Sequence, residues 1–351
     1  MRHIQLALVT IIIGTLAWAQ ANQTYQVQPG DTLFKIAQQF GTTVEELVRL
    51  NALSDAGIIE VGQTLIIRGT PASSTPTSSS AGWPAPFTEV LTSANPSAIQ
   101  GRTFAIQVGL SQPAEVTAEF LEGTFPLAPV ADGARGLIGI GPLQEPGSFP
   151  LKLSAQLADG QTQTVEFPIR VEAGGYDSEA INLPASSSNL LDRELIDAEW
   201  NRLIEIWSEF EPTKLWGGVF GYPVTPARFS SIYGTRRSFN GGPYTSFHEG
   251  LDFRGAVGTP VHAAADGQVV LAEKLTVRGN AVIINHGIGV YSGYWHMSEL
   301  DVKPDELVKK GQQIGKIGAT GMVTGPHLHW EIRILGIPVN PQQWVSEVFL
   351  P

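Results

Sequence analysis

The sequence predicts a multidomain, mainly β protein. Its 351 residues exceed what one hydrophobic core usually holds. Glycine (38 residues) and proline (24 residues) are abundant, which favours strands joined by turns. Much of the chain also reads as short stretches of alternating apolar and polar residues bounded by turn residues, the pattern of strands. Hydrophobic residues make up 42% and charged residues 16%, as in folded domains.

Charge and cysteine content exclude several classes of function. The net charge is −11 and no basic patch stands out, so nucleic acid is not an expected partner. Cysteine is absent, which excludes disulfides, thiol catalysis, Cys-ligated zinc and a lipid-modified N-terminal cysteine. We expect the chain to be a monomer.

Residues 1–21 have the composition of a secretory signal. Arg2 gives a positive start, residues 4–16 are largely apolar, and AWA or AQA offers a small-residue cleavage site. An uncleaved membrane anchor is the alternative, although the apolar run is short for a bilayer span. The stretch contains no twin-arginine pair, so we expect export before folding, with any metal bound outside. The expected locations are the periplasm, the cell wall or the medium.

Residues 24–68 predict a small βααβ unit. TYQVQ is a strand, Asp31 is placed to cap a helix, and Thr43 and Glu46 have the spacing of a capping box on a second helix. VGQTLIIR closes the unit as a strand. This order of strands and helices, together with the motif YQVQPGDTLFKIA, resembles the LysM domain, which binds glycans containing N-acetylglucosamine. The resemblance implies glycan contacts near Gly30, Asp31 and Thr32.

Three segments follow the βααβ unit. Residues 69–86 form a Pro/Ser/Thr linker, whose composition buries too little apolar surface to fold. Residues 87–172 hold strand candidates such as FAIQVGL, AEVTAEF, FPLKLSAQL and TVEFPIRV, and we predict an immunoglobulin-like β-sandwich that serves as a spacer or docking module. Residues 189–210 carry an apolar stripe at helical spacing and predict a connecting helix.

Residues 215–351 predict an antiparallel β domain that carries the chemistry. PVHAAADGQVVLA, NAVIINHGIGVYSGYWH and HLHWEIRILGIPV each read as a hairpin. Six of the seven histidines lie in this region.

Five polar residues of this region form a candidate metal site. His248 and Asp252 are four residues apart, His296 ends an expected strand, and His327 and His329 alternate along another and so share one face. Imidazoles with a carboxylate suit zinc, and a catalytic zinc uses three protein ligands. Two of the histidines are therefore left for proton transfer or oxyanion stabilisation. From spacing alone, ordinary surface or core histidines remain an alternative.

The sequence of residues 216–345 resembles that of the LytM/lysostaphin-type zinc metallopeptidases, which cut peptides of bacterial cell walls. The resemblance rests on SSIYGTRR, HEGLDFRGAVGTPVHAAADGQVV, VIINHGIGVYSGYWHMSEL, VKKGQQIGKIGATG and TGPHLHWEIR. It implies that His248, Asp252 and His329 bind one zinc, while His296 and His327 are catalytic. His262 departs from the family pattern and is interpreted as incidental. We expect a structural hydrogen-bonding or outer-shell role for His286.

The leading hypothesis is an exported peptidoglycan endopeptidase that its LysM domain targets to glycan. The alternative is a non-catalytic wall-binding activator or scaffold for another hydrolase. Family members of that kind lack one or more of the five site residues. All five are present here. A third hypothesis, a wall-anchored enzyme acting on other proteins, fits the LysM resemblance less well. Cleavage of D,D-cross-links, glycine-containing bridges and stem-peptide bonds all remain open.

Overall fold

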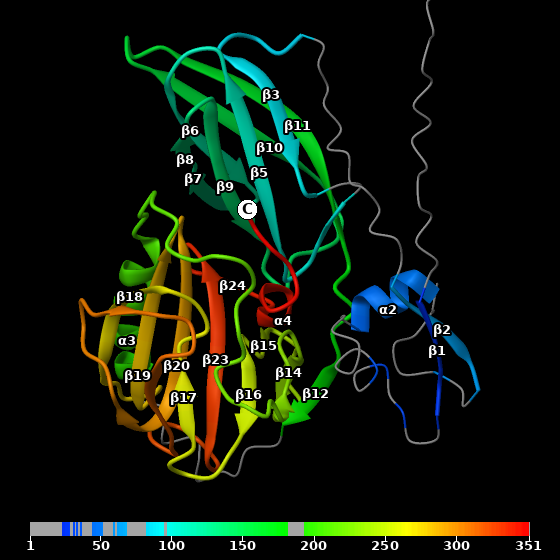
Figure 1. Ribbon diagram of the computed structural model, residues 1–351, viewed down its shortest axis with the longest axis vertical. Helices are drawn as coiled ribbons and strands as arrows, with labels where there is room; N and C mark the ends of the chain where they lie inside the picture. Colours follow the sequence, from blue (N-terminus) through cyan, green and yellow to red (C-terminus); the bar gives the residue numbers. More distant parts are fainter. Residues whose placement is uncertain are drawn as a thin grey trace, which may run out of the picture. The chain divides into compact units, whose positions relative to one another are not determined.

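The computed structural model describes residues 23–28, 31, 33, 36, 44–51, 59, 62–68, 82–94, 97–181 and 193–350. The chain divides into two compact units, Met1–Ser73 and Ser74–Pro351. Strands far outnumber helices among the described elements, so the expected mainly β class is confirmed (Figure 1). No described helix is long and apolar enough to cross a membrane. The predicted signal at residues 1–21 lies outside the described residues.

The first unit contains a two-stranded antiparallel sheet and a helix. Strand β1 (Gln23–Gln26) pairs with β2 (Thr64–Arg68), and α2 (Val44–Asn51) packs on β2. The Asn51 side chain at the end of α2 donates to the Ile66 carbonyl at 2.9 Å and accepts from the Ile66 N–H at 2.7 Å, which fixes the helix to β2. The buried core is made of Val27, Leu33, Ile36, Leu47, Leu65 and Ile67. Most of the expected first helix lies outside the described residues.

The second unit begins with two sheets that share a hydrophobic core (Figure 1). The five-stranded sheet has the order β4-β11-β10-β6-β7, and the four-stranded sheet the order β3-β5-β9-β8. Buried Val116, Ala118 and Phe120 alternate with more exposed residues on β6, which is the pattern expected of a strand that faces a core on one side. The strands are β3 (Phe87–Thr92), β4 (Ala98–Ile99), β5 (Thr103–Leu110), β6 (Ala114–Phe120), β7 (Gly123–Pro126), β8 (Ala128–Val130), β9 (Gly133–Gly139), β10 (Gly147–Leu157) and β11 (Thr162–Glu172).

The C-terminal region is built on a ten-stranded sheet with the main order β13-β16-β23-β20-β19-β18-β21. β17 and β22 pair with each other, β22 also pairs with β20, and β24 pairs with β23. A smaller sheet of β12, β14 and β15 lies outside this path. The strands are β12 (Ser178–Ile181), β13 (Phe229–Ser231), β14 (Arg236–Phe239), β15 (Ser246–Phe247), β16 (Leu251–Arg254), β17 (Pro260–His262), β18 (Gly267–Lys274), β19 (Asn280–Gly287), β20 (Val290–Leu300), β21 (Leu307–Val308), β22 (Gln313–Ile317), β23 (His327–Ile334) and β24 (Ile337–Val339).

Helix α3 (Arg193–Ser208) covers one face of β18, β19 and β20 (Figure 1). Its Leu203 and Trp207 are fully buried against Ile283 and Trp295. The apolar stripe of the sequence is thus used for packing. At the end of this segment the Tyr291 hydroxyl donates to the Glu209 carbonyl at 2.8 Å, which holds the chain after the helix against the sheet.

One expected hairpin is wrong. The stretch PVHAAADGQVVLA contains β17 and β18, but these strands do not pair with each other. β17 pairs with β22, whereas β18 lies between β19 and β21. The connecting residues 263–265 are buried alanines, and the Ala264 N–H donates to the Tyr294 hydroxyl at 2.9 Å. A hairpin turn would face solvent, whereas this connection passes through the core. The other two expected hairpins, β19–β20 and β23–β24, are confirmed.

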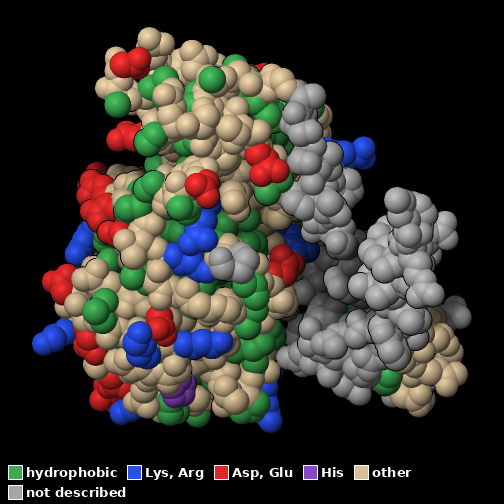
Figure 2. All heavy atoms as spheres, turned by 45° about the horizontal axis from the view of Figure 1, so that its top comes forward, with side chains coloured by type: hydrophobic (Ala, Val, Ile, Leu, Met, Phe, Trp, Pro, Cys, Tyr) green, Lys and Arg blue, Asp and Glu red, His purple; other side chains and the backbone are tan. Residues whose placement is uncertain are grey.

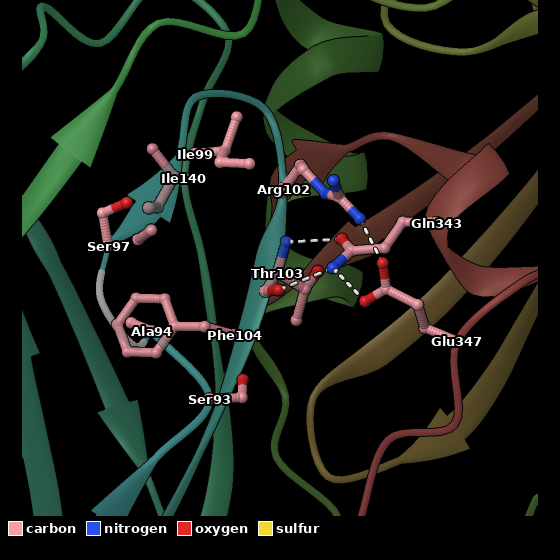
Figure 3. Close-up of a pocket in the computed structure, with 11 residues that line it drawn as sticks. Ser93, Ala94, Ser97, Ile99, Arg102, Thr103, Phe104, Ile140, Gln343 and Glu347 are labelled. Carbon is pink, nitrogen blue, oxygen red and sulfur yellow. Dashed lines mark hydrogen bonds and ion pairs between the residues drawn. The ribbon is translucent and has the colours of Figure 1, made fainter. Parts of the chain in front are cut away.

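A side-chain amide joins the two-sheet sandwich to the C-terminal region. Gln343 lies on α4 (Pro341–Trp344), and its Oε1 accepts from the Thr103 N–H at 2.8 Å while its Nε2 donates to the Thr103 carbonyl at 2.9 Å (Figure 3). β3 ends at Thr92, so the amide continues the ladder of β5 where its strand neighbour has stopped. An Arg102–Glu347 ion pair lies beside it (Figure 3). A cavity of about 200 Å³ opens at this junction.

His286 is a buried structural residue, in agreement with its expected hydrogen-bonding role. It is 0% exposed, and its Nδ1–H donates to the Asp266 carbonyl at 2.7 Å. The Nε2 lone pair therefore accepts from the Ser292 hydroxyl at 2.8 Å. Burial lowers the pKa of His286 to about 4. The residue is thus held neutral as a linker between strands.

Acidic and basic side chains are interspersed on the described part of the face shown in Figure 2. That face carries no extended patch of one sign among its described residues, although the whole chain has a net charge of −11.

Replacing Gln343 by Ala should lower the free energy of unfolding by about 2 kcal/mol, because two buried backbone groups of Thr103 lose their partner. Denaturant unfolding of the full chain measures this change. Gln156→Ala, at an exposed position on β10, is the matched control and should change stability by less than about 0.5 kcal/mol. Equal effects of the two substitutions would contradict the bridging role.

The second stability prediction concerns pH. The folded-state pKa of His286 lies at about 4, below its ordinary 6.5, so the unfolded chain binds the proton more readily. The stability from neutral His286 is complete above pH 6.5 and is lost as the pH falls toward 4, by about 3 kcal/mol in total. His286→Gln should therefore flatten the dependence of unfolding free energy on pH between 7 and 4. His262→Gln, at a half-buried position, is the control, and an unchanged slope in His286→Gln would refute the assignment.

Candidate metal centre

Strand register brings the candidate residues together. Asp252 on β16 lies directly opposite His329 on β23, and Trp295 on β20 lies opposite His329 from the other side. His296 follows Trp295 on β20, and His327 precedes His329 by two positions on β23. Successive residues of a strand point to opposite faces, so His327 and His329 share a face, as expected. His248 lies in the turn that leads into β16.

Three side-chain atoms converge on one point. The Nε2 atom of His248 lies 3.0 Å from Oδ1 of Asp252 and 3.1 Å from Nδ1 of His329. The third side of this triangle, from His329 Nδ1 to Asp252 Oδ1, is 2.9 Å. A tetrahedral zinc with bonds of about 2.0–2.1 Å separates its donors by roughly 3.3 Å. These are the three residues of the described chain whose donor atoms group tightly enough for a metal, and they suit zinc.

The outer nitrogen of each imidazole in this triangle has a partner that sets the orientation of the ring. His248 is 3% exposed, and its Nδ1–H donates to the Ile232 carbonyl at 2.9 Å, which leaves Nε2 as a lone pair. The Nε2 of His329 lies 3.5 Å from a carboxylate oxygen of Glu331. Glu331 is itself held by Arg333, whose Nε donates to it at 2.8 Å.

The remaining two imidazoles lie side by side next to this triangle. The ring centres of His296 and His327 are 5.0 Å apart. His296 donates its Nδ1–H to the Thr320 carbonyl at 3.0 Å, and His327 donates its Nδ1–H to the Gly325 carbonyl at 2.9 Å. Each ring therefore keeps a lone pair on Nε2. The Nε2 atom of His327 lies 3.9 Å from Asp252 Oδ1.

The charge of the site favours a cation. Burial lowers the pKa of His329, but Asp252 and Glu331 outweigh it and raise this pKa to about 9. Burial raises the pKa of Asp252, but the adjacent imidazoles of His248 and His329 outweigh burial and hold this pKa well below its usual range. The site thus attracts positive charge strongly at the position of the three donors. A divalent metal bound there replaces the proton on His329.

A cavity of about 340 Å³ opens over the five residues. Its walls add two arginines that the sequence did not single out, Arg237 and Arg278. The Nε of Arg237 donates to the Glu179 carboxylate at 2.7 Å, and its Nη2 donates to the Ser231 hydroxyl at 3.2 Å. The other lining residues are Phe247, Glu249, Val277, Trp295, Met322 and Glu331.

Several partners could not be found from sequence. Ile232, Thr320 and Gly325 act through backbone carbonyls, which carry no residue signature. Glu331 did have a signal, because it alternates with His327 and His329 and so shares their face. His262 does not line the cavity, and its Nδ1 lies 3.3 Å from the Pro223 carbonyl.

Of the three expected glycan contacts, Asp31 is described, whereas Gly30 and Thr32 lie outside the described residues. The Asp31 carboxylate accepts from the Tyr25 hydroxyl and from the Gln28 N–H, each at 2.7 Å. These bonds shape the loop after β1.

Two family models match the chain. Residues 246–341 match peptidase family M23, and residues 25–68 match the LysM domain. The first match holds all five candidate residues. Zinc as the cofactor is consistent with both this family and the donor set.

Relatives and a solved structure agree with the family match. The chain is 42% identical over 120 residues to the peptidoglycan DD-endopeptidase ShyA of Vibrio cholerae, which covers 34% of this chain and 28% of the relative. It is 41% identical over 128 residues to the DD-carboxypeptidase/endopeptidase Mpg of Neisseria meningitidis, covering 36% of this chain and 29% of that protein. The crystal structure of a putative peptidase M23 from Pseudomonas aeruginosa covers 72% of this chain and 96% of its own, with 26% identity and a TM-score of 0.52. This chain therefore carries a LytM-type domain of peptidase family M23 together with a LysM domain.

Proposed function

We propose that this protein is a zinc-dependent peptidoglycan endopeptidase that its LysM domain holds on the glycan. The observation that carries the proposal is the convergence of His248, Asp252 and His329 next to two imidazoles with free nitrogens. The aligned segments span 28% and 29% of the two relatives, and both relatives are named for endopeptidase activity. The name DD-endopeptidase favours D,D-cross-links as the bond cleaved.

His248, Asp252 and His329 are the proposed ligands of one zinc ion. Zinc supplies a Lewis acid that activates water at neutral pH and polarises the scissile carbonyl. Asp252 brings the negative charge that offsets part of the charge of the ion. The Ile232 carbonyl and Glu331 keep the two imidazoles turned so that one nitrogen of each faces the metal position.

His296 and His327 are the proposed catalytic pair. Because each donates Nδ1–H to a backbone carbonyl, each presents an Nε2 lone pair that accepts a proton from the attacking water. Once protonated, the same nitrogen donates to the developing oxyanion or to the leaving amine. Their rings are adjacent, so the two tasks can be divided between them.

A wall-binding activator without catalysis is the competing function. Such a protein needs no complete set of ligands and bases, whereas all five residues meet here in one cavity. The geometry therefore favours an enzyme. We further propose export to the periplasm or cell wall, because the peptidoglycan on which the relatives are named to act lies there.

Metal binding and catalysis should separate between two neighbouring histidines. His329→Ala removes a ligand and should abolish both bound zinc and activity. His327→Ala leaves the three ligands and should retain about one zinc per chain, while turnover falls by roughly 10²–10⁴-fold. Metal analysis and hydrolysis of a defined cross-linked muropeptide measure the two properties.

His262→Ala is the matched control, because this histidine belongs to the same domain but does not line the cavity. It should keep both zinc and turnover. Normal zinc content in His329→Ala, or near-native turnover in His327→Ala, would refute the assigned roles.

Removal of the first unit should slow only the reaction on insoluble wall. A truncated protein that begins at Gly82 keeps Trp83, which packs on Phe167 of the sandwich, and lacks the LysM domain. Tethering raises the local substrate concentration, with values in the millimolar range for short flexible linkers as an upper guide. Digestion of sacculi at low enzyme and substrate concentration should therefore be slower, while cleavage of a short sugar-free peptide should match the full chain.

The comparison of the two substrates separates targeting from folding. Equal slowing on both would mean that the first unit supports the catalytic domain rather than targeting. No slowing on sacculi would contradict the glycan-binding role of residues 25–68.

A further inference from the structure

Helix α3 reaches the edge of the catalytic cavity through one buried acid. Glu199 is 8% exposed, and its carboxylate contacts residues 277 and 278, which connect β18 to β19. It accepts from the Val277 N–H at 2.8 Å, from the Arg278 N–H at 3.3 Å and from the Arg278 guanidinium at 3.0 Å. Both Val277 and Arg278 line the cavity. Glu199 thus holds the backbone and a side chain of one cavity wall.

The same connection holds the backbone of His296. The Arg278 carbonyl accepts from the His296 N–H at 2.9 Å. His296 has a φ of 66°, a left-handed conformation that is unfavourable for a residue with a side chain and persists only where neighbouring groups fix it. On its other side, the His296 ring donates to the Thr320 carbonyl at 3.0 Å. The position of Arg278 therefore bears directly on how the imidazole is presented.

A third contact extends this support toward His327. The Val277 carbonyl accepts from the Met322 N–H at 2.8 Å, and residue 322 lies in the segment that leads into β23. The two catalytic imidazoles are thus tied to one short connection. Glu199 is its anchor on the helix side.

The surroundings of Glu199 make it hard to replace by solvent. The Arg278 guanidinium lies 5.4 Å from the ring centres of both Trp200 and Trp295, between the helix and β20. Without the carboxylate, two backbone N–H groups and this cation lose their partner in a half-buried place. Glu199 also lies outside residues 246–341, the segment that matches the peptidase family.

We propose that Glu199 is a positioning residue that acts through the 277–278 connection to fix His296. Its kinetic consequence rests on the proposed endopeptidase function, whereas its structural consequence does not. The connecting helix then belongs to the working catalytic unit.

Hydrogen exchange of the full-length protein tests the structural part without any activity. In Glu199→Ala, the amide of His296, which does not touch Glu199, should exchange at least about tenfold faster because its acceptor has lost its support. The amide of Ser292 on the same strand should keep its protection. Unchanged exchange at His296, or equal loss at Ser292, would overturn the proposal.

Steady-state kinetics on a defined muropeptide test the consequence. Glu199→Ala should lower kcat about 10- to 100-fold, with KM changed less than about threefold and zinc retained. Glu199→Gln keeps an acceptor oxygen of the same reach and should recover part of kcat. Glu205→Ala, at an exposed acid of the same helix, is the matched control and should match the wild type.

Arg278→Ala distinguishes the contribution of the Arg278 backbone to kcat from that of its side chain. It keeps the Arg278 carbonyl and should lower kcat less than Glu199→Ala does. An equal or larger loss in Arg278→Ala would place the effect in the guanidinium and overturn the proposal, as would a normal kcat in Glu199→Ala. A wild-type protein without hydrolytic activity would instead contradict the proposed function and leave the exchange test decisive.

Discussion

The pairing of β16 with β23 is the constraint on which the site depends. It sets Asp252 directly opposite His329, and the side-chain period of two then places His327 on the same face. A slip of one residue in this register would turn every one of these side chains to the opposite face. The pairing is secured by the buried residues between them, since Leu251, Phe253, Leu328 and Trp330 are all at 0% exposure. The hydrophobic core thus fixes the chemistry by fixing the register.

Polar groups behind the site orient each imidazole ring individually. Each of the four imidazoles uses one nitrogen for a carbonyl or carboxylate, and so the other is committed to the cavity. Glu331 is held in turn by Arg333, which also donates to the Gly336 carbonyl at 2.7 Å and lies 4.0 Å from the Trp207 ring centre. A chain of contacts therefore runs from α3 through Arg333 and Glu331 to His329. Orientation, as much as residue identity, makes the donor set usable.

The sequence predicted what depends on side-chain type and spacing. The alternation in TGPHLHWEIR placed His327 and His329 on one face, and the five polar residues of the candidate site do meet in one cavity. The sequence could not predict contacts made by backbone carbonyls or contacts between residues that are far apart in the chain. The carbonyl partners have no side-chain signature, Gln343 bonds to Thr103 across 240 residues, and β17 pairs with β22 rather than with the next strand. Glu199 has the sequence context of an ordinary acid on an amphipathic helix, because its two partner residues lie 78 and 79 positions away.

The distribution of the three proposed zinc ligands along the chain has a consequence for assembly. His248 and Asp252 are four residues apart, whereas Asp252 and His329 are separated by 77. Of the three proposed ligands, only His248 and Asp252 are therefore close together in the unfolded chain, and bringing in His329 requires closure of a long loop, which costs conformational entropy. We expect strong binding of all three donors to follow the pairing of β16 with β23, because that pairing closes the loop. Zinc would then act late, by slowing the opening of a sheet that has already formed, and apoprotein should fold along the same route as the metal-bound protein.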